Sequence, residues 1–358
     1  MIRSRIKTGA ARVLGYTGMD RLLGSLSGYR YTPLVIGYHR VVEDFRSSAR
    51  TSIPSLLLSR LMLEQHLDWI GRRYRFVDLD ELGALLESGR AVEKPVAAIT
   101  FDDGYQDFYD QALPALQKKG APAALFVVTG LVGTTRVQAH DKLYLLLARR
   151  QGRAPVKAGI PLPHIAGMTP YQAMRTLIET VSGVALEQVI RALEAEDSIP
   201  DQMYSHSVTW ETLDRIRRAG ILIGSHTRTH IVMTNETREC VLDETVGSRQ
   251  ELERRLGTAV EHFAYPSGIY NSASVSAVAE AGYRFGYTTC THRSAQHPLL
   301  TVPRTLLWEE SCLDSNRAFS DSIMSCQVHR TFDLVAGCRQ HHAIAPVTMS
   351  QGYGNAAI

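Results

Sequence analysis

Two adjacent carboxylates follow an apolar run at residues 97–105, where the chain reads AAITFDDGY. Asp102 and Asp103 carry like charges a few ångströms apart, and such charges resist joint ionisation unless another group shares one of them. The alternative is that the pair caps the helix expected next, QDFYDQALPALQKKG, but one capping aspartate is enough for that purpose. We therefore expect a chemical role for this pair.

A pair of histidines follows another apolar run in the same way. The chain reads ILIGSHTRTH over residues 221–230, so His226 and His230 stand in an HxxxH spacing directly after a predicted strand. Two imidazoles at this spacing can converge on one metal ion, although the spacing also occurs by chance. Together with one carboxylate of the Asp pair, they would form a facial triad with open positions for water and substrate. Such triads hold catalytic zinc and non-haem iron.

Two further strand ends carry residues for the same chemistry. In HFAYPSGIY (262–270), Pro266 and Gly268 could shape a loop whose backbone N–H groups stabilise an oxyanion. A Pro-x-Gly turn also occurs without any function. In GYHRV (37–41), His39 follows the first predicted strand. A lone histidine there is usually structural, but at this position it could protonate a leaving group.

These residues need a fold that brings several strand ends together. Short apolar runs alternate with amphipathic stretches, which is typical of an α/β layer or barrel whose sites lie at the carboxyl edge of parallel strands. The predicted strands are LVIGY (34–38), VAAITF (96–101), AALFVV (123–128), ILIGS (221–225), HFAYP (262–266) and RFGYTT (284–289). The predicted helices are SLLLSRLMLEQHLDWIGRR (55–73), DLDELGALLESG (78–89), YDQALPALQKKG (109–120), TWETLDRIRRAG (209–220), RECVLDETVGSRQELERRLG (238–257) and SASVSAVAEAG (272–282).

The remaining segments divide the chain into regions. Residues 131–206 contain helical pieces and Pro/Gly-rich joins without a strand, and we interpret them as a helical insertion over one face of the sheet, with a lid as one role. The insertion belongs to a main domain over residues 31–312. Residues 1–30 form a leader that is either a solvated helix or an amphipathic helix on a membrane surface. Residues 313–358 form a C-terminal extension whose end has the composition of a partly disordered tail.

Bulk composition excludes several classes of protein. The 358 residues are 44% hydrophobic and 21% charged with a net charge of +3, as in soluble globular proteins, and no basic stripe indicates nucleic acid. Five cysteines without a CxxC pair favour free thiols in a reducing compartment. We find no signal-peptide core and no apolar run that could cross a bilayer. We therefore expect a cytoplasmic protein, with peripheral contact at the inner membrane surface as one interpretation.

Taken together, the motifs resemble those of the polysaccharide deacetylases of carbohydrate esterase family 4, the NodB-homology domain. The similarity runs from about residue 33 to 310, around the insertion. TFDDGY (100–105) resembles the first family motif and SHTRTH (225–230) the second. FAYPSG (263–268) is similar to the third motif of a subgroup that also carries YHRV near its N-terminus, typified by deacetylases of exported poly-N-acetylglucosamine.

This resemblance implies a distorted (β/α) barrel and a divalent metal held by Asp103, His226 and His230. Zinc is the usual ion, and cobalt, nickel or iron(II) suit the same ligands. The resemblance further implies that Asp102 is the general base and that His39 replaces the acid of a late Leu-x-His motif, of which we find no copy.

The sequence departs from the family pattern in two places. The arginine that usually opens the third motif is Phe263 here, so the group that orients the general base is in question, and Arg304 of VPRT is the candidate replacement. The Asp/Trp-bearing fourth motif is not recognisable, which also leaves the identity of the acid in question.

The implied reaction is removal of N-acetyl groups from an amino sugar or polysaccharide, by attack of a metal-bound water on the amide carbonyl, to give acetate and a free amine. The candidate substrate-binding residues, whose alternative is ordinary packing, are Tyr105, Tyr265, Pro266, Ser267 and Tyr270. Three alternatives stay open at this point: a glycan O-deacetylase, a non-sugar amidase of the same fold, and a sugar-binding protein with a decayed site.

Overall fold

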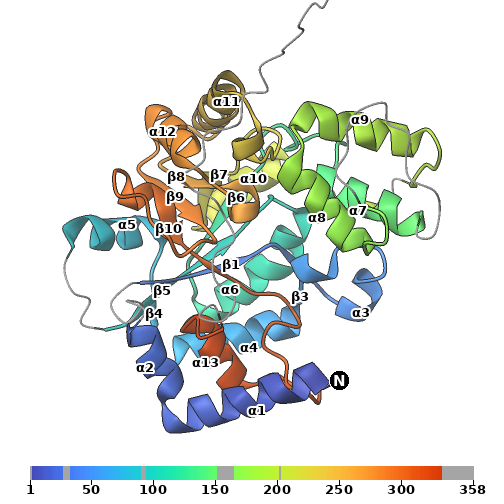
Figure 1. Ribbon diagram of the computed structural model, residues 1–358. Helices are drawn as coiled ribbons and strands as arrows, with labels where there is room; N and C mark the ends of the chain where they lie inside the picture. The colour runs from blue at the N-terminus through green and yellow to red at the C-terminus, as the bar shows by residue number, and fades with distance from the viewer. Residues whose placement is uncertain (1, 27–32, 90–93, 151–164, 201–202, 333–358) are drawn as a thin grey trace, which may run out of the picture.

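A sheet of nine parallel strands forms the centre of the protein in the computed structural model, which describes residues 2–26, 33–89, 94–150, 165–200 and 203–332 (Figure 1). The order is β10-β9-β8-β7-β6-β5-β1-β11, and β4 pairs with the start of β5. The bounds are β1 (Leu34–Tyr38), β4 (Arg75–Phe76), β5 (Val96–Phe101), β6 (Ala123–Val127), β7 (Leu222–Ser225), β8 (His262–Ala264), β9 (Phe285–Thr288), β10 (Val302–Pro303) and β11 (Thr305–Leu306). Two short strands, β2 (Arg40–Val42) and β3 (Leu57–Ser59), form a second parallel pair.

One residue separates the two edges of this sheet. β10 pairs with β9 and β11 pairs with β1, and only Arg304 lies between β10 and β11 in the chain. The sheet is therefore nearly closed into a barrel, which confirms the predicted barrel fold. Because every strand in it runs parallel, all the carboxyl ends lie at one end of the barrel.

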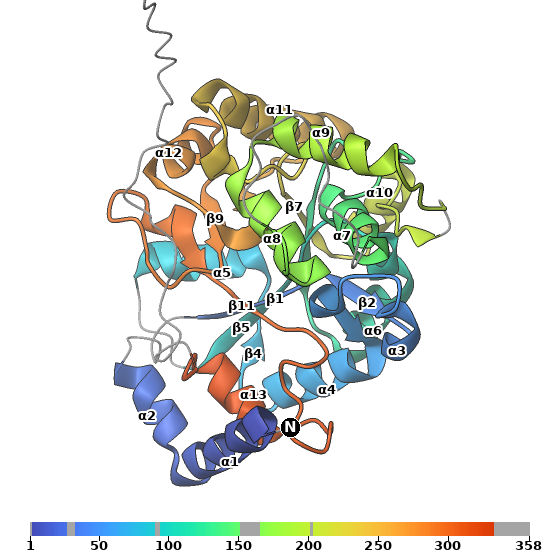
Figure 2. The ribbon, with the colours of Figure 1, turned by 45° about the vertical axis from the view of Figure 1, so that its right-hand side comes forward.

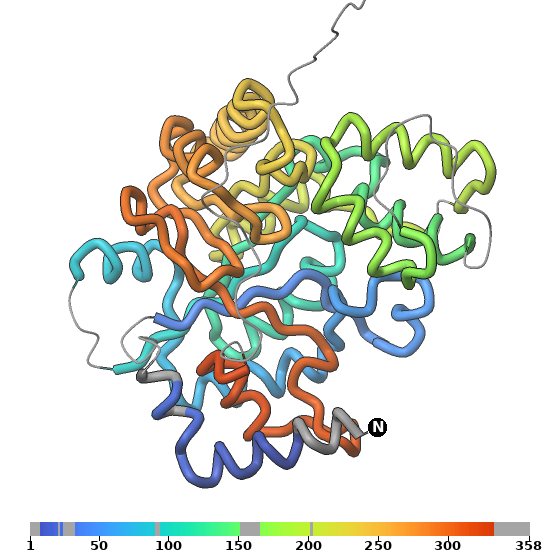
Figure 3. The backbone as a smooth tube through the Cα atoms, viewed as in Figure 1, coloured from blue at the N-terminus to red at the C-terminus, as the bar shows by residue number. Residues whose placement is uncertain are grey.

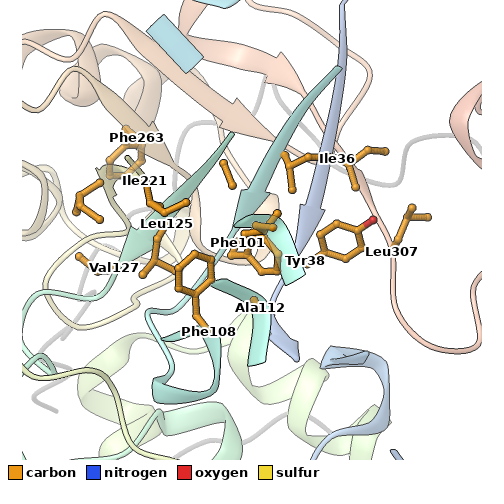
Figure 4. Close-up of a cluster of buried hydrophobic side chains, with 14 of the residues drawn as sticks. Ile36, Tyr38, Phe101, Phe108, Ala112, Leu125, Val127, Ile221, Phe263 and Leu307 are labelled. Atoms are coloured by element: carbon orange, nitrogen blue, oxygen red, sulfur yellow. The ribbon is translucent and has the colours of Figure 1, made fainter. Parts of the chain in front are cut away.

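Alternate side chains of the strands pack into two separate cores. Ile36, Phe101 and Leu125 point outward and meet the surrounding helices, and part of this outer core is shown in Figure 4. Phe126 and Tyr287 belong to the inner core, where their ring centroids lie 5.5 Å apart. The interior is therefore packed with side chains rather than hollow.

Most outer helices begin at a side chain that caps them. Ser59, Thr209 and Thr237 each accept a hydrogen bond from a backbone N–H in the first turn, which satisfies a donor that the helix leaves free. The helices of the barrel are α3 (Phe45–Ser48), α4 (Arg60–Gly71), α5 (Leu79–Ser88), α6 (Leu113–Lys119), α10 (Trp210–Arg218), α11 (Arg238–Leu256) and α12 (Ser272–Glu280).

One predicted helix begins later than expected. We predicted a helix over residues 55–73, but Leu57–Ser59 forms β3 beside β2, and α4 begins at Arg60. The apolar run at its start cannot be assigned from periodicity alone, because a short buried strand and a helix turn have the same composition.

The described part of segment 131–206 forms three helices, α7 (Ala139–Arg149), α8 (Pro170–Thr180) and α9 (Gly183–Glu194). They have their own apolar core, which includes Ile53 and Val232 from loops that follow strands of the barrel. In Figures 1 and 2 the three helices lie together at the end of the barrel to which β1 points. The insertion therefore packs beside the carboxyl ends of the strands.

The two ends of the described chain lie side by side. The leader forms α1 (Ile2–Thr17) and α2 (Met19–Leu26), and α1 packs against α13 (Asp321–Val328), as Figure 3 also shows. Ala11 of α1 and Ile323 of α13 share a small apolar core. The loose tail predicted at the end of the C-terminal extension, residues 339–358, lies outside the described residues.

We expect His66 to make the protein sensitive to acid. His66 of α4 is fully buried, and burial lowers its pKa to about 3. The unfolded chain binds a proton at this residue from about pH 6.5 downward, whereas the folded protein does so only near pH 3. Stability should therefore fall as the pH falls through this window, by about 1.4 kcal/mol for each unit. Urea unfolding of His66→Phe at pH 7 and pH 4.5 should show a smaller loss than the wild type, whereas the same change at the exposed His206 should leave the loss unchanged.

Candidate metal centre and active site

Three strand ends bring the predicted polar residues together at the carboxyl end of the barrel. Asp102 and Asp103 follow β5, His226 follows β7 and His39 follows β1. Oδ1 of Asp103 lies 3.6 Å from Nε2 of His226 and 3.3 Å from Nε2 of His230. The donor atoms of these three residues lie within 4.8 Å of one another, so one ion could contact all of them.

The chemistry of this cluster fits a divalent metal. Both carboxylate oxygens of Asp103 are buried and have no hydrogen-bond partner among the described residues, an arrangement that is costly without a cation. Burial, with the charges of Asp102 and Asp141, raises the pKa of Asp103 well above its usual range. A cation would reverse this effect, because a positive charge favours the ionised form.

Both candidate histidine ligands present a free nitrogen to the cluster. Burial lowers the pKa of both His226 and His230, so both imidazoles are neutral as metal binding requires. Nδ1 of His226 lies 2.7 Å from the carbonyl oxygen of Ala264 and must donate its proton there. Nε2 is therefore left with its lone pair facing Asp103.

The loop that carries the histidines is held by a residue that the sequence motifs did not reveal. Glu244 of α11 is buried and accepts hydrogen bonds from the backbone N–H groups of Arg228 (2.8 Å) and Thr229 (2.9 Å). Among the described residues, four of the six non-glycine residues with positive φ lie at this site, namely Asp103, Thr227, His230 and Ser267. Such conformations cost energy and persist only where surrounding contacts impose them.

Asp102 has a different partner from its neighbour. Its two carboxylate oxygens accept hydrogen bonds from the guanidinium of Arg304 at 2.7 and 2.8 Å, in the bidentate geometry that favours both charges. Burial opposes ionisation of Asp102, but the charge and the hydrogen bonds of Arg304 outweigh it, and the pKa of Asp102 lies below its usual value. Neither aspartate caps the following helix, and adjacent carboxylates coexist because each faces a different group.

Arg304 occupies the place for which the sequence made it a candidate. It is 1% exposed, and it also donates to Oγ1 of Thr100 at 3.1 Å. Its guanidinium lies over the ring of Phe126 in the inner core. Arg304, which lies between the two edge strands β10 and β11, is thus also the partner of Asp102.

His39 lies beside Asp102, with 4.0 Å between its Nε2 and Oδ2 of the carboxylate. Its side chain is 17% exposed. Burial lowers its pKa to about 4, and this effect exceeds the opposing attraction of Asp102. The four residues His39, Asp102, His226 and His230 therefore surround one small volume next to Asp103.

The three tyrosines among the candidate substrate-binding residues are buried. Tyr105 and Tyr265 are 0% exposed and Tyr270 is 4% exposed, so none of them has a ring face open to a ligand. Tyr265 and Tyr270 pack in the outer core instead, with ring centroids 5.7 Å apart. Ordinary packing, the alternative that the sequence left open, explains these aromatic residues.

The loop after β8 retains one candidate donor for an oxyanion. The N–H of Tyr265 is used in the sheet, where it donates to the carbonyl of Tyr287 at 3.0 Å, and Pro266, which is buried, has no N–H. Ser267, the next residue, is exposed and has a φ of 57°. Because Tyr265 and Pro266 have no free N–H, the N–H of Ser267 is the candidate donor in this segment.

Two residues of the insertion lie at the site, although no pattern in the sequence predicted their position. His140 and Asp141 of α7 are buried and contact Tyr105 of the TFDDGY motif. The sequence predicted only a helix there, because a His-Asp pair at a helix start is ordinary for a surface helix.

Comparison with known proteins agrees with the fold and the motifs. Residues 89–286, more than half of the chain, match the family model for polysaccharide deacetylase. The chain therefore belongs to the polysaccharide deacetylase family.

The relatives and the solved structure described next are distant from this chain in sequence. The chain is 21% identical to YxkH of Bacillus subtilis strain 168 over 236 residues, which cover 66% of this chain and 60% of YxkH. It is 31% identical over 110 residues to the poly-beta-1,6-N-acetyl-D-glucosamine N-deacetylase of Staphylococcus epidermidis, covering 28% of this chain and 38% of that protein. The chain thus matches less than two thirds of the length of either relative. The fold is similar to that of the Streptococcus pyogenes deacetylase PplD, with a TM-score of 0.52, 20% identity and coverage of 78% of this chain and 93% of PplD.

Proposed function

We propose that this protein is a metal-dependent hydrolase that removes N-acetyl groups from an amino sugar or a glycan. The observation that supports it most strongly is that the two aspartates have different surroundings. Asp102 is ionised and paired with Arg304, whereas Asp103 has no hydrogen-bond partner among the described residues and lies beside two neutral imidazoles. Family membership and the named substrate of the Staphylococcus epidermidis relative support the substrate class. That relative also supports the placement in the subgroup with the YHRV element.

Asp103, His226 and His230 would hold the ion, and zinc is our first choice because two imidazoles and a carboxylate suit it. A divalent ion held there supplies a water of lowered pKa and polarises the acetyl carbonyl. Asp102 accepts the proton of the attacking water, because Arg304 keeps its carboxylate ionised. The N–H of Ser267 is placed to donate to the carbonyl oxygen as negative charge develops on it.

His39 would pass a proton to the departing amine nitrogen as the C–N bond breaks. With a pKa of about 4 this imidazole is neutral at pH 7, so the proton has to come from a neighbour. Asp102, 4.0 Å away, has just received one from water. Acetate and the free amino sugar leave, and both side chains return to their starting states.

Acetate release from N-acetylglucosamine oligomers tests this proposal. The full chain should release acetate with zinc and stop when the metal is stripped, and Asp102→Asn and His226→Ala should both be inactive. His39→Ala should slow the amide reaction by about 10²- to 10⁴-fold, the usual contribution of a general acid. It should slow hydrolysis of an O-acetyl ester far less, because an alkoxide can leave without prior protonation much more easily than an unprotonated amide nitrogen can.

Other outcomes would favour the alternatives. Release of acetate from O-acetylated glycans alone would indicate an O-deacetylase. Stoichiometric zinc binding without acetate from any glycan would contradict the proposal and favour a non-sugar amidase or a sugar-binding protein.

We also propose that the N-terminal helices contact an anionic membrane surface. Residues 1–30 contain six basic residues and one acidic residue. Four large apolar side chains project into solvent from α1 and α2, namely Val13, Tyr16, Met19 and Leu22. None of the described helices has the length and the apolar character needed to cross a bilayer. With the reducing compartment that the sequence predicts, this surface would be the cytoplasmic face of the membrane.

Vesicle co-sedimentation tests this surface. The protein should pellet with vesicles that contain phosphatidylglycerol, and replacing the four apolar residues by serine should weaken binding at least about tenfold, since each buried side chain contributes about 1.5 kcal/mol or more. Serine at two exposed apolar residues of the insertion, Tyr171 and Val184, is the control and should change nothing. Equal pelleting of all three proteins would contradict the proposal.

A further inference from the structure

A buried arginine of the C-terminal extension contacts the main chain of Arg304. Arg330 follows α13 and is 7% exposed. Its Nη2 donates to the backbone carbonyl of Arg304, and its Nε donates to Oγ1 of Thr305 at 3.2 Å. Arg330 lies beyond residues 89–286, the stretch that matches the family model. The sequence motifs therefore gave no reason to place it near the active site.

The backbone of Arg330 has a conformation that arginine rarely adopts. α13 ends in a Schellman motif, in which the N–H of Arg330 donates to the carbonyl of Gln327 at 3.0 Å and the N–H of Thr331 donates to that of Cys326 at 2.9 Å. The φ of Arg330 is 52°, in the left-handed region. Glycine is the usual residue at this point of the motif, because a side chain there costs energy. An arginine in its place indicates that the side chain has a role.

The main chain changes its strand partner at Arg304. β10 pairs with β9 and β11 pairs with β1, so the chain leaves one edge of the sheet and joins the other at this residue. The N–H of Arg304 donates to the carbonyl of Thr288 in β9 at 2.7 Å, and its own carbonyl accepts from Arg330. A buried carbonyl without a donor costs energy, and Arg304 is 1% exposed. Arg330 thus fixes the carbonyl of Arg304 as β9 fixes its N–H.

The side chain of Arg304 depends on this placement. Its Nη1 and Nη2 reach the two carboxylate oxygens of Asp102 at 2.7 and 2.8 Å, and Nη1 also donates to Thr100. Such a bidentate pair requires one geometry. A displacement of about 1 Å near a reacting group can slow a reaction by about 100-fold. A shift of the Arg304 main chain would therefore weaken its pair with Asp102.

The helix that precedes Arg330 is itself held by the leader. Ser325 of α13 donates to Oδ2 of Asp20 in α2, and Nδ1 of His329 lies 3.4 Å from the same oxygen. Asp20 is buried between these two helices. The helix end that carries Arg330 is therefore anchored on a neighbouring part of the fold.

We infer that Arg330 is a positioning residue that holds Arg304 against the general base Asp102, and that the C-terminal extension completes the active site by supplying it. The inference rests on the proposed function, in which Asp102 is the base. It assigns a role in the reaction to a residue outside the sequence motifs.

Acetate release at varied substrate concentration tests this inference. Arg330→Met removes the donors but keeps a long side chain, and kcat should fall about 10- to 100-fold while KM stays near the wild-type value. Arg330→Gly should cause a similar loss, although glycine favours the backbone conformation at this position. Arg330→Lys keeps a donor and should recover part of the rate. In an Arg304→Lys background Arg330→Met should cost little more, because both changes act through one group.

Ile323→Ala is the matched control. Ile323 is a fully buried residue of α13 and packs in the small apolar core with Ala11 of the leader. The change should lower the urea midpoint of unfolding and leave kcat and KM unchanged. A fall in kcat as large as in Arg330→Met would overturn the inference, because it would show that any loosening of α13 slows the reaction. Wild-type kcat in both Arg330→Met and Arg330→Gly would also overturn it, while leaving the proposed function intact.

Unfolding of the metal-free proteins gives a readout that does not depend on activity. Arg330→Met should lower the urea midpoint, and this loss should be smaller in an Asp102→Asn background, because the pair that Arg330 supports is then already broken. Equal losses in the two backgrounds would overturn the inference. If the wild type releases no acetate, the proposed function fails, and the unfolding comparison still decides whether Arg330 supports the pair of Arg304 with Asp102.

Discussion

Replacing Asp103 by asparagine should stabilise the metal-free protein and abolish its response to zinc. The carboxylate is buried, has no hydrogen-bond partner among the described residues and lies beside Asp102, so without a cation it is a cost to the fold. Zinc at about 1,000 times its dissociation constant should add about 4 kcal/mol to the stability of the wild type. Asp103→Asn should gain none of this, and chemical unfolding with and without zinc measures both effects.

The pH dependence of this difference follows from the raised pKa of Asp103. The folded protein keeps the proton at pH values where the unfolded chain, with an ordinary pKa of 3.8, has already lost it. Wild-type stability without metal should therefore fall as the pH rises above about 3.8, until Asp103 ionises in the folded protein. Asp103→Asn should lack this loss, so its advantage should grow with pH.

Asparagine at the exposed Asp110 controls for the substitution itself and should change neither quantity. If metal-free Asp103→Asn is less stable than the wild type at every pH, the carboxylate has a structural partner, and the interpretation of this cluster as a metal site is wrong.

Removing Arg304 should cause the second large effect, on stability and on activity together. Arg304→Met leaves Asp102 buried without its partner, which typically costs about 3–5 kcal/mol. Asp102 would also lose the group that keeps it ionised, so its pKa should rise. The rate of acetate release should then fall at a higher pH than in the wild type as the solution is acidified, because the base must be ionised to accept a proton.

Two companion variants keep this prediction testable if Arg304→Met folds poorly. Arg304→Lys retains the charge but not the bidentate geometry, and it should shift the acid limb of the pH–rate profile in the same direction by a smaller amount. Adding Asp102→Asn to Arg304→Met should recover part of the stability without any activity. Zinc affinity should stay near that of the wild type in Arg304→Lys, and an unshifted pH profile there would show that Arg304 does not act through Asp102.

The sequence by itself predicted which residues form the candidate metal site. The Asp pair and the HxxxH spacing are local patterns at the ends of buried strands, and parallel strands must place their carboxyl ends together. The alternation of strands and helices predicted an α/β layer or barrel, and the resemblance to the polysaccharide deacetylases implied the barrel. Six of the strands could be predicted, and all of them except β8 have four residues or more. The strands β2, β3, β4, β10 and β11 have only two or three residues and carry too little pattern.

Only the tertiary structure decided how these residues are partnered. Arg304 lies 202 positions from Asp102, and their bidentate pair depends on which strands form the two edges of the sheet. His140 contacts Tyr105 because the insertion packs on the carboxyl end of the barrel, and a His-Asp pair at a helix start does not predict that. The tyrosines near the motifs are buried for the same reason: side-chain direction on a short strand or turn depends on closure of the barrel, a non-local property that residue type and spacing do not encode.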